Sequence, residues 1–197
     1  MSTRPWCKRC NKVQVACICH MITEIDNKYK LIILQHPSEA NKAVGTARIL
    51  SLSLKRCEVI CAETIPHNLL SFAPTYLLYP NEGECLQASH ANFPTNSQFI
   101  LLDGSWRKAY RLLQMNPELQ MLPRIAIDVK QPTQYKIRKS SKEQGVSSVE
   151  AGFYLLSQLE GDEMKFQSLL NTFQSMIDFQ LAKMPTATRN KNYQSEG

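Results

Sequence analysis

Five short apolar runs, separated by polar segments, restrict the fold of this chain more than any other feature of its sequence. Each run has the length of a β-strand, and the runs lie at residues 29–35, 57–61, 76–79, 99–102 and 124–129. Segments with apolar residues at helical spacing lie between or after them, at residues 39–54, 106–116, 147–159 and 163–183. Strands that alternate with helices predict an α/β domain, in which helices flank a mainly parallel sheet.

Local signals predict where two of these helices begin. Ser147, followed three residues later by Glu150, fits a capping box at the start of a helix. Gly45 lies inside the first helical segment, where a glycine costs about 1 kcal/mol. It therefore suggests either a later helix start or a close approach of two backbones.

Length and composition predict one main domain with two small appendages. The chain has 197 residues, of which 43% are hydrophobic, enough for a sizeable core. Residues 4–20 are rich in cysteine but have too few apolar residues to fold alone. We therefore expect a Cys-rich head at residues 1–22, a main domain at 23–184 and a flexible tail at 185–197.

The sequence also predicts the compartment. It has no run of 18 apolar residues, which argues against a membrane span, and its first residues lack the apolar segment of a secretory signal. A cytoplasmic location follows as the expectation, and the seven cysteines are then expected to be free thiols or metal ligands.

Four cysteines near the N-terminus have a spacing that suits a metal. Cys7, Cys10, Cys17 and Cys19 fall within thirteen residues and could surround one tetrahedral Zn²⁺. The alternatives are four free cysteines or a Cys-x-x-Cys redox pair, although no strand precedes Cys7 as it would in a redox protein. His20 is an alternative fourth ligand in place of Cys19.

Charge is unevenly distributed along the chain. The formal net charge is +6, and two basic regions, residues 1–60 and 104–142, flank a segment without lysine or arginine at 61–103. A concentrated positive surface is typical of proteins that bind a polyanion. The alternative is a set of solvated helix faces, which the count of charges alone does not distinguish.

Polar residues follow several of the predicted strands, where ligands bind in open α/β sheets. Asp103 ends an apolar strand, Ser105 can cap the following helix, and Trp106 offers a flat face to a base. The alternative is that Asp103 and Ser105 only cap a helix and that Trp106 belongs to the core.

Together these segments resemble the DTW-domain family, named for an Asp-x-Thr-Trp motif. The resemblance runs from about residue 7 to about 181, and Ser105 stands where the motif has threonine, which keeps the hydroxyl. The matching segments are the cysteine head, LIILQHPSE (31–39), VGTARIL (44–50), LLYP (77–80), LLDGSW (101–106), YKIRK (135–139) and SSVEA (147–151).

The resemblance implies an enzyme like the bacterial tRNA-uridine aminocarboxypropyltransferases of this family. They transfer the 3-amino-3-carboxypropyl group of S-adenosylmethionine to N3 of a uridine in the tRNA variable loop, position 47 in relatives. The products are acp3U and methylthioadenosine. Relatives that modify rRNA have a fold similar to the knotted SPOUT methyltransferases, which implies a C-terminal trefoil knot that holds S-adenosylmethionine.

The resemblance also implies roles for individual residues. Asp103 would act as general base or would orient the uracil, and Ser105 and Trp106 would shape its pocket. The donor site would be lined by Thr46, Leu78, Pro80, Leu102, Trp106, Ser147, Ser148 and Glu150. The tRNA phosphates would be contacted by Arg107, Lys108, Arg111, Arg138, Lys139 and Lys142, the last three of which could instead hold the donor carboxylate.

Two other functions fit the same residues. One is a SPOUT-like RNA methyltransferase, which would use the methyl group of the same donor. The other is a non-enzymatic, zinc-containing RNA-binding module, in which the polar residues at the strand ends are only helix caps. In the enzyme that the resemblance implies, the zinc head would serve as a docking lobe for tRNA, and no obligatory protein partner is inferred.

Overall fold

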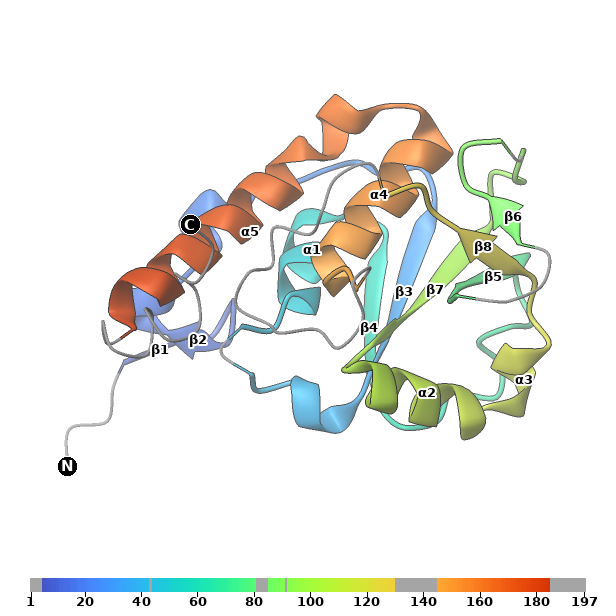
Figure 1. Ribbon diagram of the computed structural model, residues 1–197, viewed down its shortest axis with the longest axis horizontal. Helices are drawn as coiled ribbons and strands as arrows, with labels where there is room; N and C mark the ends of the chain where they lie inside the picture. The colour runs from blue at the N-terminus through green and yellow to red at the C-terminus, as the bar shows by residue number, and fades with distance from the viewer. Residues whose placement is uncertain (1–4, 43, 81–84, 91, 130–144, 185–197) are drawn as a thin grey trace, which may run out of the picture.

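A six-stranded, entirely parallel sheet forms the centre of the computed structural model (Figure 1), which describes residues 5–42, 44–80, 85–90, 92–129 and 145–184. The strands lie in the order β4-β3-β7-β5-β8-β6. Their bounds are β3 (Lys30–Gln35), β4 (Cys57–Cys61), β5 (Thr75–Leu78), β6 (Leu86–Gln87), β7 (Gln98–Asp103) and β8 (Arg124–Ala126). The predicted α/β class with a mainly parallel sheet is confirmed.

Helices cover both faces of the sheet (Figure 1). The helices are α1 (Ala47–Ser53), α4 (Ser148–Glu160) and α5 (Glu163–Lys183) on one face, and α2 (Trp106–Gln114) and α3 (Pro117–Gln120) on the other. Leu31 and Ile33 of β3 pack in the first core, whereas Ile32 and Leu34 pack in the second. Because successive side chains of a strand point to opposite faces, a strand buried on both faces is a continuous apolar run.

Local sequence fixes the ends of α4 and the start of α5. Ser147 accepts a hydrogen bond from the backbone of Glu150, whose carboxylate accepts one from the Ser147 backbone, so the predicted capping box is confirmed. Gly161 ends α4 with φ 67°, a left-handed conformation that glycine adopts without strain. Asp162 then caps α5 by accepting from the backbone N–H of Lys165.

Several elements differ from the sequence prediction. The segment expected to be helical from residue 39 instead has a short 3-10 helix, η3 (Pro37–Glu39), and α1 begins only at Ala47. A turn in which Gly45 N–H donates to the Lys42 carbonyl separates the two, which is the later start that Gly45 suggested. β8 stops at Ala126, because its neighbour β6 is two residues long and Asp128 N–H turns toward the Gln158 side chain of α4.

The head packs onto the main domain through a buried apolar side chain and through a hydrogen bond to its backbone. It consists of a hairpin, β1 (Trp6–Cys7) with β2 (Lys12–Val13), and two 3-10 helices, η1 (Gln14–Ala16) and η2 (Cys19–Met21). Ile18 is buried in the same core as α1, α4 and α5. The Thr172 hydroxyl of α5 donates to the Met21 carbonyl at 2.9 Å. Among the described residues, no helix has the length and apolar character that a bilayer crossing requires.

Candidate active site and metal centre

The four cysteine sulfurs of the head converge on one point. Cys7 ends β1, Cys10 lies in the following turn, and Cys17 and Cys19 come from the segment after β2. All four Sγ atoms lie within 4.8 Å of one another, and the Cys7–Cys19 and Cys10–Cys17 pairs are both 3.7 Å apart. Four sulfurs at the zinc distance of a tetrahedral site are about 3.8 Å apart, so the cluster can hold such an ion.

Without metal, the thiols of the cluster differ in pKa. Hydrogen bonds from the Cys10 backbone and from the Cys17 side chain lower the pKa of Cys7 to about 6. Burial, together with the neighbouring thiols, raises the pKa of Cys19 to about 12. At neutral pH one sulfur is therefore a thiolate and another keeps its proton. A divalent ion would bind both as thiolates and release that proton, so metal affinity should rise with pH.

Asp103 ends β7 at the carboxyl edge of the sheet, and only 6% of it is exposed. The Gln35 amide donates to its Oδ2 at 2.7 Å, and the Ser148 hydroxyl donates to its Oδ1. Both donors are neutral, and they come from the end of β3 and the first residue of α4. Within the described residues this carboxylate does not cap α2, so the capping alternative is wrong for Asp103.

Three residues form a row along this edge. Sheet register pairs Cys61 of β4 with Gln35 of β3, and Gln35 with Asp103 of β7. Residues in register on parallel strands point to the same face, so these side chains face the layer of α1 and α4. Gln35 is a site residue that sequence reasoning missed, because an amide at the end of an apolar strand becomes notable only through its register with Asp103.

The turn after Asp103 depends on a glycine. A Cβ on Gly104 would lie 2.9 Å from the Lys108 Cβ, closer than such atoms approach in proteins, so only glycine allows this turn into α2. Ser105 occupies the predicted N-cap position, but its side chain makes no capping hydrogen bond there. Trp106 begins α2 and meets the Tyr79 ring edge to face, with centroids 6.4 Å apart.

The other residues predicted to line the donor site are spread around this edge. Ser148 contacts Asp103 directly, whereas Ser147 and Glu150 bond to each other in the capping box. Thr46 is buried at the N-cap of α1, and Pro80 is exposed after β5. Leu78 is in register with Leu101 and shares the face of Asp103, but Leu102 packs against the α2 side of the sheet.

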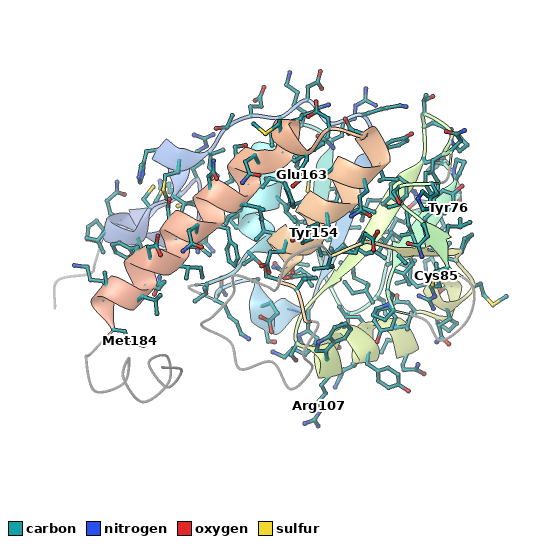
Figure 2. All side chains as sticks on the ribbon, turned by 45° about the horizontal axis from the view of Figure 1, so that its top comes forward. Tyr76, Cys85, Arg107, Tyr154, Glu163 and Met184 are labelled. Atoms are coloured by element: carbon teal, nitrogen blue, oxygen red, sulfur yellow. The ribbon has the colours of Figure 1, made fainter. Side chains whose placement is uncertain are left out.

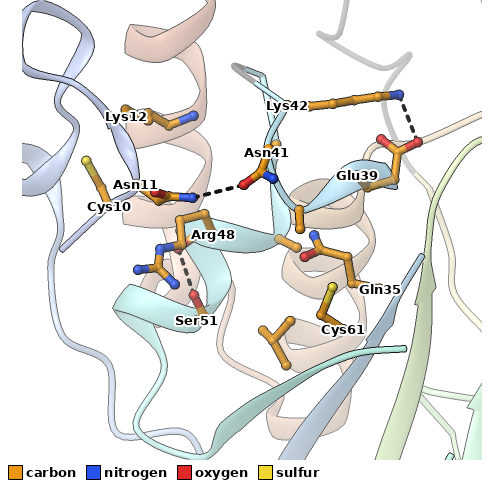
Figure 3. Close-up of a pocket in the computed structure, with 14 residues that line it drawn as sticks. Cys10, Asn11, Lys12, Gln35, Glu39, Asn41, Lys42, Arg48, Ser51 and Cys61 are labelled. Atoms are coloured by element: carbon orange, nitrogen blue, oxygen red, sulfur yellow. Dashed lines mark hydrogen bonds and ion pairs between the residues drawn. The ribbon is translucent and has the colours of Figure 1, made fainter. Parts of the chain in front are cut away.

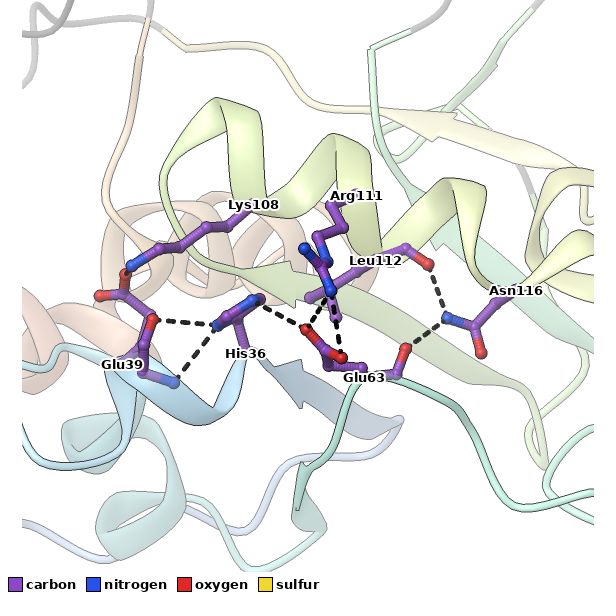
Figure 4. Close-up of polar contacts among 8 residues, drawn as sticks. His36, Glu39, Glu63, Lys108, Arg111, Leu112 and Asn116 are labelled. Atoms are coloured by element: carbon purple, nitrogen blue, oxygen red, sulfur yellow. Dashed lines mark hydrogen bonds and ion pairs between the residues drawn. The ribbon is translucent and has the colours of Figure 1, made fainter.

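The basic residues predicted on α2 are in different surroundings (Figure 4). Lys108 Nζ lies 2.7 Å from the buried Glu39 carboxylate, which also pairs with Lys42 at 2.8 Å. Arg111 pairs with Glu63 at 3.2 Å, and His36 lies 3.3 Å from the same carboxylate. Arg107 projects away from the body of the protein (Figure 2). Arg138, Lys139 and Lys142 lie outside the described residues.

Electrostatics keep Glu39 ionised. Burial alone would raise the pKa of this carboxyl, but the hydrogen bonds and charges of Lys108 and Lys42 outweigh burial, and the pKa is lowered. Two of the cations on this side of the site are therefore already matched by a carboxylate. The pairing joins η3 to α2, two segments that flank the ends of β3 and β7.

Comparisons with known proteins identify relatives along most of the chain. A family model described as "DTW domain" matches residues 4–181. Three similar curated proteins bear the name tRNA-uridine aminocarboxypropyltransferase 2. The macaque (Macaca fascicularis) protein is 28% identical over 191 residues, which cover 90% of this chain and 64% of that protein. The mouse (Mus musculus) protein is 26% identical, over 96% of this chain and 68% of its own length.

The fruit-fly (Drosophila melanogaster) protein is 24% identical over 201 residues, covering 95% of this chain and 79% of that protein. This chain therefore spans somewhat less than two thirds of the macaque relative. No solved structure gives a match of comparable strength.

Proposed function

This chain belongs to the DTW-domain family, and from that premise we propose that it transfers the 3-amino-3-carboxypropyl group of S-adenosylmethionine to N3 of a tRNA uridine. The observation that carries the proposal is the buried Asp103 carboxylate, held by two neutral donors at the carboxyl edge of the sheet. The names of the three relatives support the same reaction. The products are acp3U, which we place in the variable loop of the tRNA, and methylthioadenosine.

Asp103 takes the role of general base in this proposal. The uridine N3 gives its proton to the carboxylate, and the N3 lone pair forms a bond to the methylene carbon beside the sulfonium. The bond between that carbon and sulfur breaks, its electron pair remains on sulfur, and methylthioadenosine leaves. Because a sulfonium is already a good electrophile, most of the acceleration comes from positioning. Gln35 and Ser148 position the carboxylate, since each fixes one of its oxygens.

The donor site is proposed to lie at the same edge. Ser105 and Trp106 shape the pocket beside Asp103, while Thr46, Leu78, Pro80, Leu102 and the turn at Ser147–Glu150 line it. A C-terminal trefoil knot as in the SPOUT methyltransferases is part of this proposal. In its support, the described chain leaves β8 at one side of the sheet and returns at Ser148 to contact Asp103 on a central strand.

The head completes the proposal as a structural zinc site and a docking lobe for tRNA. Its support is the convergence of four sulfurs at distances that suit a tetrahedral ion. Arg107, Lys108, Arg111, Arg138, Lys139 and Lys142 are proposed to contact RNA phosphates or, for the last three, the donor carboxylate. Because the structure places none of the seven cysteines in a disulfide, the proposed location is the reducing cytoplasm.

Two labelled batches of S-adenosylmethionine test the reaction. One carries label in the carboxyl carbon and the other in the methyl group, and each is incubated with the protein and unmodified tRNA. Carboxyl label in the RNA, without methyl label, is the expected result. Methyl label would make the protein a methyltransferase. If neither label appears and no donor binds, the protein is a binding module.

Asp103→Asn tests the catalytic role within that assay. We expect turnover to fall by about 100-fold or more, the usual contribution of a general base, while tRNA affinity changes less than about twofold. Asp178→Asn, at a solvent-facing carboxylate on α5, is the matched control and should retain full turnover. Normal turnover in Asp103→Asn would show that another group takes the proton.

A further inference from the structure

A cavity lies between the head and the carboxyl edge of the sheet (Figure 3). Its volume is about 290 Å³, close to the lower end of the range for small-molecule sites. The head contributes Cys10, Asn11 and Lys12 to its wall, α1 contributes Arg48 and Ser51, and the sheet contributes Gln35 and Cys61. The cavity adjoins the ion pair between η3 and α2, because Glu39, the partner of Lys108, also lines it.

The cavity reaches the proposed active site through one side chain. Gln35 lines the cavity and at the same time donates to Asp103 at 2.7 Å. The register of β4, β3 and β7 places Cys61, Gln35 and Asp103 in one row. A group that contacts Gln35 in the cavity is therefore one side chain away from the proposed general base.

Positive charge dominates the surroundings of the cavity. Lys12, Lys42 and Arg48 line it, and Lys8 and Arg9 are exposed on the adjoining turn of the head. Glu39 is the acidic residue among those that line the cavity. Four thiolates around a divalent ion would add a net charge of about −2. The five cations outnumber the negative charges of this cluster and of Glu39 taken together. Charge complementarity thus points to an anionic ligand.

An exposed aromatic ring is hydrogen-bonded to a residue that lines the cavity. Trp6 is 53% exposed, and its indole N–H donates to Asn11 at 2.8 Å. Asn11 in turn donates to Asn41 at 3.3 Å, and both asparagines line the cavity. A basic groove beside an exposed aromatic ring is how many proteins hold single-stranded nucleic acid, with phosphates in the groove and a base on the ring.

We propose that this cavity binds the RNA backbone next to the target uridine, with a phosphate between Lys12 and Arg48 and a neighbouring base stacked on Trp6. The proposal rests on the function proposed above and specifies how its RNA substrate is held. In this proposal, metal bound by the four cysteines fixes Cys10, Lys12 and Trp6 of the head, which forms the wall that receives the phosphate.

Substitutions that introduce a negative or a positive charge at Cys61 test whether the cavity binds a phosphate. Cys61 is exposed, ends β4 and lines the cavity, so Cys61→Glu and Cys61→Lys place a negative or a positive charge there with side chains of similar size. We expect Cys61→Glu to weaken binding of an unmodified tRNA transcript by about tenfold and Cys61→Lys to tighten it. Affinity is measured by fluorescence anisotropy of labelled tRNA at several salt concentrations, with the metal-loaded full chain.

Two further variants refine the test. Arg48→Gln should reduce the slope of log affinity against log salt by about one, as the loss of one phosphate contact does. Trp6→Ala should weaken binding by about tenfold and Trp6→Phe by less, because phenylalanine keeps a stacking face. Lys55→Gln is the control, since Lys55 is exposed, pairs with Glu24 at 3.5 Å and precedes β4 at the opposite edge of the sheet. It should bind tRNA like the unaltered chain.

The outcomes separate this proposal from the proposed reaction. Equal tRNA affinity for Cys61→Glu and Cys61→Lys would overturn the cavity proposal, even if the unaltered chain transfers carboxyl label. A change in S-adenosylmethionine affinity in place of tRNA affinity would assign the cavity to the donor and would also overturn it. If tRNA affinity follows the charge at residue 61 but no label is transferred, the reaction proposal fails and the cavity proposal stands.

Discussion

The head and the carboxyl edge of the sheet hold their polar groups in place by different means. The head has two strands of two residues each and two 3-10 helices of three residues each. Little regular secondary structure therefore holds its four cysteines in place. Asp103 ends a six-residue strand paired on both sides, with Phe99 and Ile100 fully buried before it. The comparison teaches that Asp103 is held by packing, whereas the four cysteines have the arrangement of a metal site, so different perturbations should disturb each.

Removal of the metal should give the largest effect and should be confined to the head. Because zinc binding supplies on the order of 10 kcal/mol to small Cys₄ sites, chelation or Cys10→Ser should unfold residues 6–22. Hydrogen exchange should then speed up in the head while amides of β3 and β7 stay protected. Cys61→Ser serves as control, because Cys61 lies outside the cluster. Metal content near zero in freshly purified, reduced protein would contradict the role of the ion.

Gly104→Ala should disturb the sheet edge in the same selective way. The added Cβ meets the Lys108 Cβ at 2.9 Å, so α2 must shift, at a cost of about 1–3 kcal/mol as for other overpacked sites. Turnover should fall by about 100-fold, because a shift of about 1 Å at a catalytic group has that effect. Denaturant unfolding measures the loss of stability, and transfer of labelled donor measures the loss of turnover. Unchanged turnover would mean that the turn tolerates a side chain. As a control, the metal content of Gly104→Ala should equal that of the unaltered chain.

Ser148→Ala sharpens the comparison with a smaller change at the edge. Loss of one neutral hydrogen bond to Asp103 should cost about 1 kcal/mol, or roughly fivefold in kcat. Ser148→Thr, which keeps the hydroxyl, should restore kcat, and Ser175→Ala on exposed α5 is the matched control.

Glu39→Gln should have the smallest effect, seen mainly in the pH dependence of stability. The pKa of Glu39 is lowered in the folded chain, because Lys108 and Lys42 outweigh its burial. A carboxyl with a lowered folded pKa stabilises the protein above its unfolded pKa, and that stabilisation is lost as pH falls through the folded value.

The urea midpoint of the unaltered chain should therefore fall more steeply below about pH 4.5 than that of Glu39→Gln. At neutral pH the variant should be about 1 kcal/mol less stable, a small value because the lysine partners are partly exposed. Glu118→Gln, exposed on α3, is the control. Parallel pH curves for the two proteins would show that the ion pairs contribute nothing.

Much of the fold could be predicted from sequence, because β3 and β7 are buried on both faces and form unbroken apolar runs. The capping box of α4 and the bounds of α5 followed from local signals that the structure keeps. The start of α1 was predicted too early, since apolar spacing continues through residues that form a 3-10 helix.

Contacts between distant segments were beyond prediction. Gln35 meets Asp103 across 68 positions, and Lys108 meets Glu39 across 69, so neither pairing has a local signal. The cluster of Cys7, Cys10, Cys17 and Cys19 is the opposite case, because all four ligands lie close together in sequence. A single sequence therefore reveals candidate metal ligands more readily than the partners of a buried carboxylate.

The contact between the head and α5 has a consequence for the order in which the chain can mature on the ribosome. Met21 receives its hydrogen bond from Thr172, 151 residues later. The head is made before the helix that supports it, so a nascent chain completes its four-cysteine segment long before the head can dock on α5. Because closing so long a loop is slow, docking of the head should be a late step of folding. A chain released before α5 is complete would carry a head that lacks its contact with this helix.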